Sequence, residues 1–399
     1  MAYLAKGHAS YNQTLLALFS GSFITFMILY SVQTLFPLFT AEFDVTPAIA
    51  SLSLSVTTGF LAITMIAASF LSDSFGRKRM MSLSLFLSAL FCIIASFSQD
   101  FTFFLLMRAL QGIALAGFPA VAMAYVSEEF HPGNLGVAMG IYVSGTAFGG
   151  LSGRLITGIL TSYFSWETAL LSIGLISLLL SLWFVRALPE PKQSERKSAW
   201  NIESFFTAFT YNLKEKKLLA LFGISFLLMG GFVTLYNYLG FYLMADPFNL
   251  SQAAIGVIFI IYLVGTFSST FMGRLSDMAG KKRMLPVSLL IMLSGVLITL
   301  SGPLSLILIG LAVFTFGFFG SHSIASNWVG ELATIHRAQA TSLYLLAYYL
   351  GSSIMGTVGG FIWDSSGWHG VILLVSSLTG IALMLVVVVG FSGAKKGNA

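Results

Sequence analysis

The stretch Ser69-Phe-Leu-Ser-Asp-Ser-Phe-Gly-Arg-Lys-Arg79 returns later in the chain as Gly273-Arg-Leu-Ser-Asp-Met-Ala-Gly-Lys-Lys-Arg283. In both copies an aspartate precedes a glycine by three residues, and three basic residues follow the glycine directly. The two aspartates, Asp73 and Asp277, are 204 positions apart. This distance is about half of the chain, so the sequence predicts two related halves.

A second set of matches supports the repeat at a nearly equal offset of 202 positions. If each half holds about six helices, this even number gives both halves the same orientation in a membrane, which is a parallel repeat. The matched pairs are Tyr142 with Tyr344, Gly149 with Gly351, Gly158 with Gly360 and Trp166 with Trp368.

The composition indicates a membrane protein. Of the 399 residues, 57% are hydrophobic and 9% are charged, and the mean hydropathy is +0.89. A soluble domain has about 45–50% apolar and about 25% charged residues. The apolar runs recur from Leu15 to Phe391, so a soluble enzyme, a nucleic-acid binder and a disordered scaffold are excluded.

The apolar runs have the length that helices need to cross a bilayer, which is roughly 20 residues. They are continuous rather than alternating, which excludes an outer-membrane barrel. We therefore expect an all-α integral membrane protein with twelve transmembrane helices in two six-helix bundles. The predicted spans are 15–39, 48–72, 80–98, 101–126, 135–161, 166–187, 218–244, 252–275, 284–301, 304–328, 339–363 and 368–391.

The charged residues orient these spans, because cytoplasmic loops of membrane proteins are rich in Lys and Arg. With the N-terminus in the cytoplasm, no Lys or Arg lies in any predicted outer loop. We therefore expect a multi-pass protein of the cell (inner or plasma) membrane with both termini cytoplasmic. The outer loops carry acids instead, at Glu42, Asp44, Asp100, Glu167, Asp246 and Asp364.

The predicted domain organisation has three parts: an N-terminal bundle over 1–187, a cytoplasmic linker over 188–217 and a C-terminal bundle over 218–399. Within the linker, apolar residues at helical spacing from Ile202 to Leu213 predict a short helix. Two placements remain open for it. It can lie on the inner membrane surface, with nearby lysines at anionic headgroups, or on the cytoplasmic face of the protein itself.

The repeated acidic and basic motif predicts a gate at the cytoplasmic ends of the helices. Its glycine permits a backbone turn that other residues resist. Its carboxylate can accept hydrogen bonds from the free N–H groups where a neighbouring helix begins, near Leu135 or Gln339. The alternative is that these charges only set the topology. The predicted gate residues are Asp73, Gly76, Arg77, Asp277, Gly280 and Lys281.

With these motifs in place, the chain resembles the major facilitator superfamily of transporters. The inner-loop signature of that family matches at both copies, although Ser69 stands at the leading glycine and Lys281 where arginine is usual. A fourth-helix motif matches at Arg108-Ala-Leu-Gln111-Gly112. The pattern is most similar to the drug:proton antiporter and sugar- or nucleoside-efflux branch, and within it to the bacterial YnfM-like permeases. The resemblance implies the major facilitator fold, alternating access and a cavity lined by helices one, four, seven and ten.

Two arginines lie at the same depth, about 10 Å from the outer ends of their helices. The resemblance assigns Arg108 to proton coupling, and the alternative is a structural arginine bonded to backbone carbonyls. Arg154 stands where the antiporter signature has its last glycine, and Gly150 replaces the proline of that signature. Because no acid lies at this depth, the pair indicates that an anionic or strongly polar group enters the cavity. The alternative is that hydroxyls, carbonyls and water satisfy both arginines.

The fifth predicted span has a stripe of small residues at Gly145, Gly149 and Gly153, which permits close contact with another helix. We expect that helix to belong to the other half of the chain.

His322 is the only histidine deep in a predicted span, and its titration range suits a proton switch. The alternative role is that of a hydrogen-bonding cavity residue. Tyrosines with polar tips on the seventh and eleventh predicted spans suit a cavity for mixed organic ligands. The resemblance adds Tyr30, Arg108, Asn237 and His322, which lie on the family-implied helices one, four, seven and ten. The predicted cavity residues are Tyr30, Gln33, Arg108, Tyr142, Arg154, Tyr236, Asn237, His322, Tyr344 and Tyr348, with Arg108 and His322 as the proton-coupling pair.

The predicted function is secondary transport of a small organic solute by alternating access, as proton-coupled efflux. The alternative is a facilitator or importer of an anionic or polar metabolite. The five histidines lack metal-ligand spacing and the chain has no phosphate-binding Gly-x-x-x-x-Gly-Lys-Ser/Thr loop, so we expect no enzyme activity, no metal and no cofactor. The expected partners are the substrate, the proton and the lipid bilayer. We expect a monomer that binds no nucleic acid.

Overall fold

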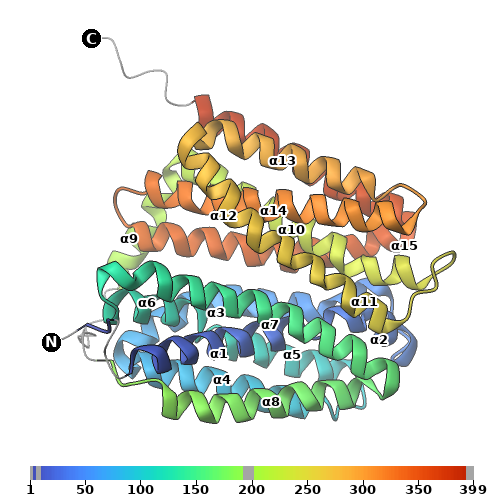
Figure 1. Ribbon diagram of the computed structural model, residues 1–399, viewed down its shortest axis with the longest axis horizontal. Coiled ribbons are helices and arrows are strands. Elements are labelled where there is room, and N and C mark those ends of the chain that lie inside the picture. The colour runs from blue at the N-terminus through green and yellow to red at the C-terminus, as the bar shows by residue number, and fades with distance from the viewer. Residues whose placement is uncertain (1–2, 6–9, 192–201, 392–399) are drawn as a thin grey trace. The chain divides into compact units, whose positions relative to one another are not determined.

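The computed structural model describes residues 3–5, 10–191 and 202–391, and helices make up most of them (Figure 1). The first half contains α1 (Tyr11–Tyr30), η1 (Gln33–Leu35), α2 (Phe36–Glu42), α3 (Pro47–Phe75), α4 (Arg77–Ala95), α5 (Phe101–Leu115), α6 (Pro119–Glu129), η2 (Pro132–Asn134), α7 (Leu135–Tyr163) and α8 (Trp166–Ala187). The second contains α9 (Ile202–Lys214), α10 (Lys216–Met244), α11 (Gln252–Ile258), η3 (Phe259–Ile261), α12 (Tyr262–Ala279), α13 (Lys281–Ile298), α14 (Leu304–Leu332) and α15 (Arg337–Phe391).

Among the described residues, ten helical stretches are long and apolar enough to cross a membrane. One of them, Gln339–Gly390, has 52 residues and bends at Gly367, where φ is 56° and ψ is −147°. This stretch therefore accounts for two of the predicted spans. The remaining predicted span is α13, which has 18 residues and begins with three basic side chains.

Three predicted spans are broken rather than continuous. The first is interrupted after Tyr30 by the short helix η1, and the eighth is interrupted by η3. The fourth divides into α5 and α6 just before Pro119. Proline lacks an N–H group, which the first turn of a helix does not need, so α6 begins at Pro119.

The chain forms two compact units. Unit 1 comprises Met1–Val45, Leu52–Trp200 and Leu250–Phe259, and unit 2 comprises Thr46–Ser51, Asn201–Asn249 and Ile260–Ala399. Each unit thus includes a short stretch from the opposite half of the sequence. The two stretches begin 204 residues apart, which is the offset of the repeated motif. Residues 192–201 of the predicted linker lie outside the described residues, so the three-part division stays a prediction.

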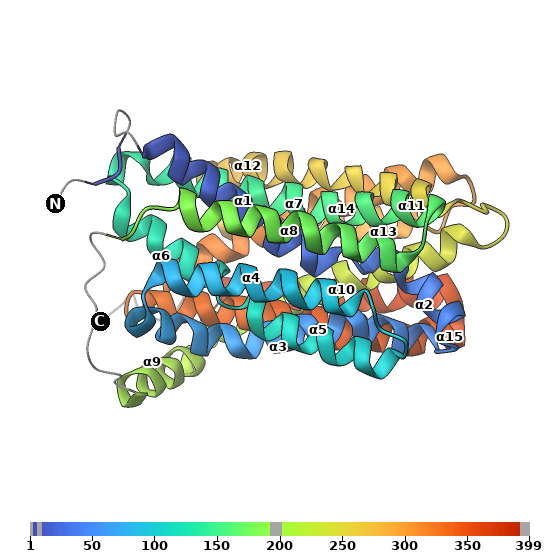
Figure 2. The same ribbon diagram turned by 90° about the horizontal axis from the view of Figure 1, so that it is seen from below.

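The glycine stripe of α7 packs against α1 within unit 1, so the expected contact with the other half is wrong (Figure 2). A β-carbon at Gly149 would overlap the carbonyl oxygen of Phe23, and one at Gly153 would overlap that of Met27. The small residues serve to bring two helices of the same unit together. The prediction was wrong because spacing shows that a face is small and not which helix covers it.

Unit 2 repeats this contact between α10 and α15. A β-carbon at Gly351 would overlap the carbonyl oxygen of Phe226, just as a β-carbon at Gly149 would overlap that of Phe23. Four residues further along both helices, the glycine lies on the other helix of the pair. Gly230 of α10 faces Met355 of α15, whereas in unit 1 the methionine lies on α1 and the glycine on α7. The repeat therefore extends from sequence to packing.

Candidate functional site

Unit 1 holds a charged cluster at the end of α3. Arg77 donates two hydrogen bonds of 2.5 Å to the two carboxylate oxygens of Glu128. The same guanidinium lies 3.1 Å from the Asp73 carboxylate and donates to Ser72 Oγ at 3.1 Å. Such a bidentate pair of arginine and carboxylate is both stronger and more directional than a single contact. The cluster therefore links the turn after α3 to the end of α6.

Unit 2 holds the corresponding cluster at the end of α12. Lys281 Nζ lies 2.5 Å from Glu331 Oε1 and 3.5 Å from Asp277 Oδ1. The turn glycines, Gly76 and Gly280, have φ values of 95° and 89°. Side chains with a β-carbon rarely adopt this backbone, which explains why glycine recurs at both positions.

The structure thus brings each predicted gate triplet together and adds a partner. Glu128 and Glu331 lie near the ends of their helices, where the sequence favours a gate or cap role for them. Their sequence signal is their near-equal spacing from Arg77 and Lys281. The predicted bond from each aspartate to the start of a neighbouring helix stays a prediction.

Arg108 is held by backbone carbonyls. Its Nε donates to Ser53 O at 2.7 Å, and its two terminal nitrogens donate to Ile28 O at 3.3 Å and Leu29 O at 2.9 Å. The Gln111 side chain accepts a further bond of 2.6 Å. The side chain is 1% exposed, and its bonds join α1, α3 and α5. This geometry favours the structural alternative for Arg108.

Arg154 has a different environment. Its Nε donates to Gln33 Oε1 at 2.6 Å, and Nη1 donates to Gly150 O of its own helix at 2.7 Å. The guanidinium carbon lies 4.1 Å from the ring centre of Tyr30 and 4.8 Å from that of Phe259. The charge therefore lies between two aromatic faces, which attract cations, and beside a neutral amide. Three predicted residues, Tyr30, Gln33 and Arg154, come together here.

Hydrogen bonds connect α11 to Thr34 and to α7 within unit 1. The side-chain nitrogen Nε2 of Gln252 donates to Thr34 O, and the backbone N–H of Ala253 donates to Ser162 Oγ at 2.9 Å. Gly158 and Gly256 bring the backbones of α7 and α11 into contact. Sequence reasoning did not select Gln252 or Phe259. The only available signal was that Gln252 is a polar residue at the start of an apolar run.

In unit 2 the predicted residues His322, Tyr344 and Tyr348 form one cluster. The Tyr344 hydroxyl lies 2.9 Å from His322 Nδ1, and the centres of the His322 and Tyr348 rings are 4.7 Å apart. Tyr344 is buried, whereas His322 and Tyr348 are partly exposed. The cluster therefore combines a titratable ring, a hydrogen-bonded phenol and access from outside the packed core.

The remaining predicted cavity residues are placed separately. The Tyr236 hydroxyl lies 2.6 Å from Thr315 Oγ1, and its ring packs against Tyr262. Asn237 is buried beside it on α10. The Tyr142 hydroxyl donates a long bond of 3.5 Å to Pro119 O. Among the described residues, no three His, Cys, Asp or Glu side chains lie close enough together to hold a metal ion.

Comparison with known proteins identifies the family. The model of the Major Facilitator Superfamily matches residues 18–259 and 221–397. The chain is 43% identical over 385 residues to the uncharacterized MFS-type transporter YybF of Bacillus subtilis, covering 96% of this chain and 95% of that protein. It is 41% identical to the inner membrane transport protein YnfM of Escherichia coli, over 96% and 92% of the two chains.

The chain belongs to the major facilitator superfamily. Its fold is similar to that of a bacterial homologue of the human lysosomal transporter Spinster, with a TM-score of 0.77 at 18% identity over 96% of this chain and 95% of that one. The predicted family and fold class, twelve helices in two bundles, are confirmed. The protein is a membrane transporter and not an enzyme.

Proposed function

We propose that this transporter exports a small organic solute from the cell in exchange for protons, by alternating access. Its orientation follows from the charges. The ends that carry Arg77 and Lys281 face the cytoplasm with both termini, since the predicted loops on the opposite side carry no Lys or Arg. The linked clusters at these ends, Asp73 with Arg77 and Asp277 with Lys281, would then act as cytoplasmic gates.

The observation that carries the proton-coupling proposal is the cluster around His322. Histidine is a common proton carrier in proteins, and the phenol of Tyr344, 2.9 Å from His322 Nδ1, can stabilise one protonation state of the ring. Partial exposure of His322 gives protons a route to the ring. Arg108 is less suited to this role, because its bonds to the carbonyls of Ile28, Leu29 and Ser53 need a permanent donor.

Transport into proteoliposomes with an imposed pH gradient tests this proposal. Solutes from the sugar, nucleoside, carboxylate and amphipathic drug classes are supplied in turn. We expect one class to accumulate against its gradient and to stop doing so when a protonophore collapses the pH difference. In His322→Gln, solute exchange at equal pH should persist while accumulation is lost. Accumulation by wild type that ignores the pH gradient would rule out proton exchange.

A second candidate function is a facilitator or importer of an anionic or polar metabolite, and Arg154 favours it. This arginine lies in the interior of unit 1, and the acids of that unit stand at or beyond the ends of its helices. An anionic substrate group would bind this guanidinium beside the Tyr30 ring and the Gln33 side chain. Under this alternative, Arg154→Gln should abolish the flux of an anionic solute. Arg186→Gln, at an exposed position, should leave that flux unchanged. The flux through the wild-type protein should not depend on the pH gradient.

A further inference from the structure

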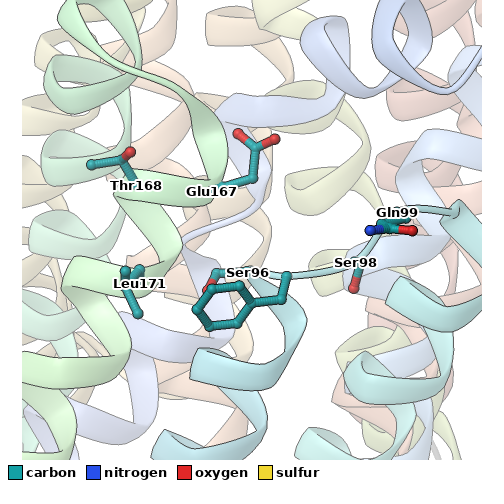
Figure 3. A pocket seen from close by; sticks show the side chains of 7 residues that line it. Ser96, Ser98, Gln99, Glu167, Thr168 and Leu171 are labelled. Atoms are coloured by element: carbon teal, nitrogen blue, oxygen red, sulfur yellow. The ribbon is translucent and has the colours of Figure 1, made fainter.

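A surface hollow of about 420 Å³ lies beside the start of α8, away from the residues discussed above. Figure 3 shows it between two segments of unit 1, with Thr168 and Leu171 of α8 on one side and Ser98 and Gln99 of the α4–α5 connection on the other. The Glu167 carboxylate lies between these segments (Figure 3). We call this site the α8 hollow. Its other lining residues are Ser96 and Phe97.

Two oxygen atoms of the α8 hollow have unused hydrogen-bonding capacity. Ser98 is 6% exposed, and its hydroxyl has no partner among the described residues. The same holds for Glu167 Oε2, and the described residues form no ion pair with this carboxylate. Burying such groups without a partner costs about 1–3 kcal/mol each. Both oxygen atoms are buried, so the Ser98 and Glu167 side chains rotate about single bonds to meet a donor in the hollow.

The internal repeat shows that the acid is not needed to begin this helix. An acid in the first turn of a helix interacts favourably with the helix dipole, which is the plain explanation of Glu167. Trp166 corresponds to Trp368, so Glu167 corresponds to His369 in the second half. The segment after the bend at Gly367 is therefore helical without a carboxylate at this position. The acid is a feature of unit 1 alone.

Under the orientation proposed above, the α8 hollow lies at the outer surface of the membrane. Three exposed aromatic residues, Phe97, Tyr163 and Phe164, stand at this level, and Phe97 is 68% exposed. Aromatic residues of membrane proteins collect at the depth of the lipid headgroups. The predicted outer loops offer Glu167 no Lys or Arg, so a cation must come from outside the protein.

We propose that the α8 hollow binds a primary ammonium group, held by the Glu167 carboxylate and the Ser98 hydroxyl. A primary ammonium carries one positive charge and three N–H donors, which matches one carboxylate and neighbouring acceptor oxygens. A quaternary ammonium has the charge and no donor. The group can belong to a phosphatidylethanolamine headgroup of the outer leaflet or to a free amine. The proposal rests on the proposed orientation only in assigning the site to that leaflet.

Native mass spectrometry of the intact transporter, titrated with phospholipids of matched acyl chains, tests this site. We expect wild type to bind phosphatidylethanolamine more tightly than phosphatidylcholine or phosphatidylglycerol. In Glu167→Gln, affinity for phosphatidylethanolamine should fall roughly five- to tenfold, because a charge-assisted bond is lost. The matched control is Glu42→Gln, which removes an exposed acid outside the hollow and should leave the preference unchanged.

Two further variants keep the test decisive if Glu167→Gln folds poorly. Ser98→Ala removes a donor and acceptor without a charge and should weaken binding about threefold, whereas Glu167→Asp should retain the preference for phosphatidylethanolamine. Competition by free ethanolamine at millimolar concentration identifies a free amine as the source, and lack of competition identifies the lipid. Equal phosphatidylethanolamine affinity in wild type, Ser98→Ala and Glu167→Gln would overturn the proposal. Because binding is read without transport, that result leaves the proposed function untouched.

Discussion

Arg108 shows how a buried cation can be satisfied without a carboxylate. Its guanidinium is planar and fixes its donors in a fork, and this fork meets three carbonyls from the two helices α1 and α3 and one amide side chain. A lysine has one compact ammonium group and cannot reach all of these acceptors. The residue therefore acts as a structural link between α1, α3 and α5.

Arg108→Lys should lower the stability of the protein although the charge is retained. Stranding even one or two of these acceptors costs about 2–4 kcal/mol, and the midpoint of thermal unfolding should fall by roughly 3–8 °C. Differential scanning fluorimetry in detergent measures the shift. Arg186→Lys on the exposed end of α8 provides the control and should melt like wild type. Equal melting of both variants would show that the carbonyl contacts contribute little.

The positions of the two buried arginines within their helices could be predicted from the sequence, but their contacts could not. The position follows from counting residues along a helix, which needs only the apolar runs. The acceptors of Arg108 are backbone atoms at Ile28, Leu29 and Ser53, which carry no signature in side-chain identity. Likewise, Phe259 reaches Arg154 across 105 positions of sequence, and only the packing of α11 on α7 brings them together.

At the scale of single elements, the two charged clusters offer a matched comparison. Arg77 binds Glu128 through two bonds and is nearly buried, whereas Lys281 binds a more exposed Glu331 through one. Burial and bidentate geometry strengthen an ion pair, and water weakens one.

We therefore expect a double-mutant cycle on Arg77 and Glu128 to give a coupling energy of about 1–3 kcal/mol, against less than about 1 kcal/mol for Lys281 and Glu331. Both cycles use alanine variants and thermal or denaturant unfolding. Equal coupling energies in the two units would contradict the assigned geometry.

Helix α7 provides its own control for the close contact with α1. A methyl group at Gly149 would overlap the carbonyl of Phe23, whereas nothing lies within 4 Å of the corresponding position at Gly140. Gly149→Ala should destabilise the protein by about 1–3 kcal/mol, the usual cost of overpacking. Gly140→Ala should be neutral or slightly stabilising, because alanine favours helix more than glycine does. Thermal unfolding measures both variants, and their changes in stability should have opposite signs or clearly different sizes.

Boundaries of elements were harder to predict than their existence. The sixth predicted span, 166–187, agrees with α8. Ser165 fixes the start of this helix by accepting a hydrogen bond from Thr168 N. The break before Pro119 falls inside the predicted span 101–126, although the proline is visible in the sequence. Pro37 follows η1 in the first turn of α2 and marks that interruption, whereas η3 contains no proline or glycine and depends on packing that the sequence does not display.

At the scale of the whole molecule, the repeat was predictable because it is written twice in the sequence. The composition of the two compact units was not. Two short stretches belong to the unit formed mainly by the opposite half of the sequence, namely Thr46–Ser51 and Leu250–Phe259. Each of them nevertheless begins a long apolar run of its own half. Hydropathy gives the span but carries no information on which neighbours its first turns contact.

The count of twelve spans and the proposed orientation depend together on α13, the helix that lies outside the ten long apolar stretches. Met278, which is 85% exposed, precedes α13, and the exposed Gly302 follows it. The chain has a single cysteine, Cys92, which is buried, so Cys92→Ser gives a background for single-cysteine variants. In intact cells a membrane-impermeant maleimide should label Gly302→Cys, and Met278→Cys should react only after the membrane is permeabilised. Labelling of both in intact cells would mean that α13 does not cross the membrane, and the reverse pattern would invert the orientation on which the gate and the α8 hollow are placed.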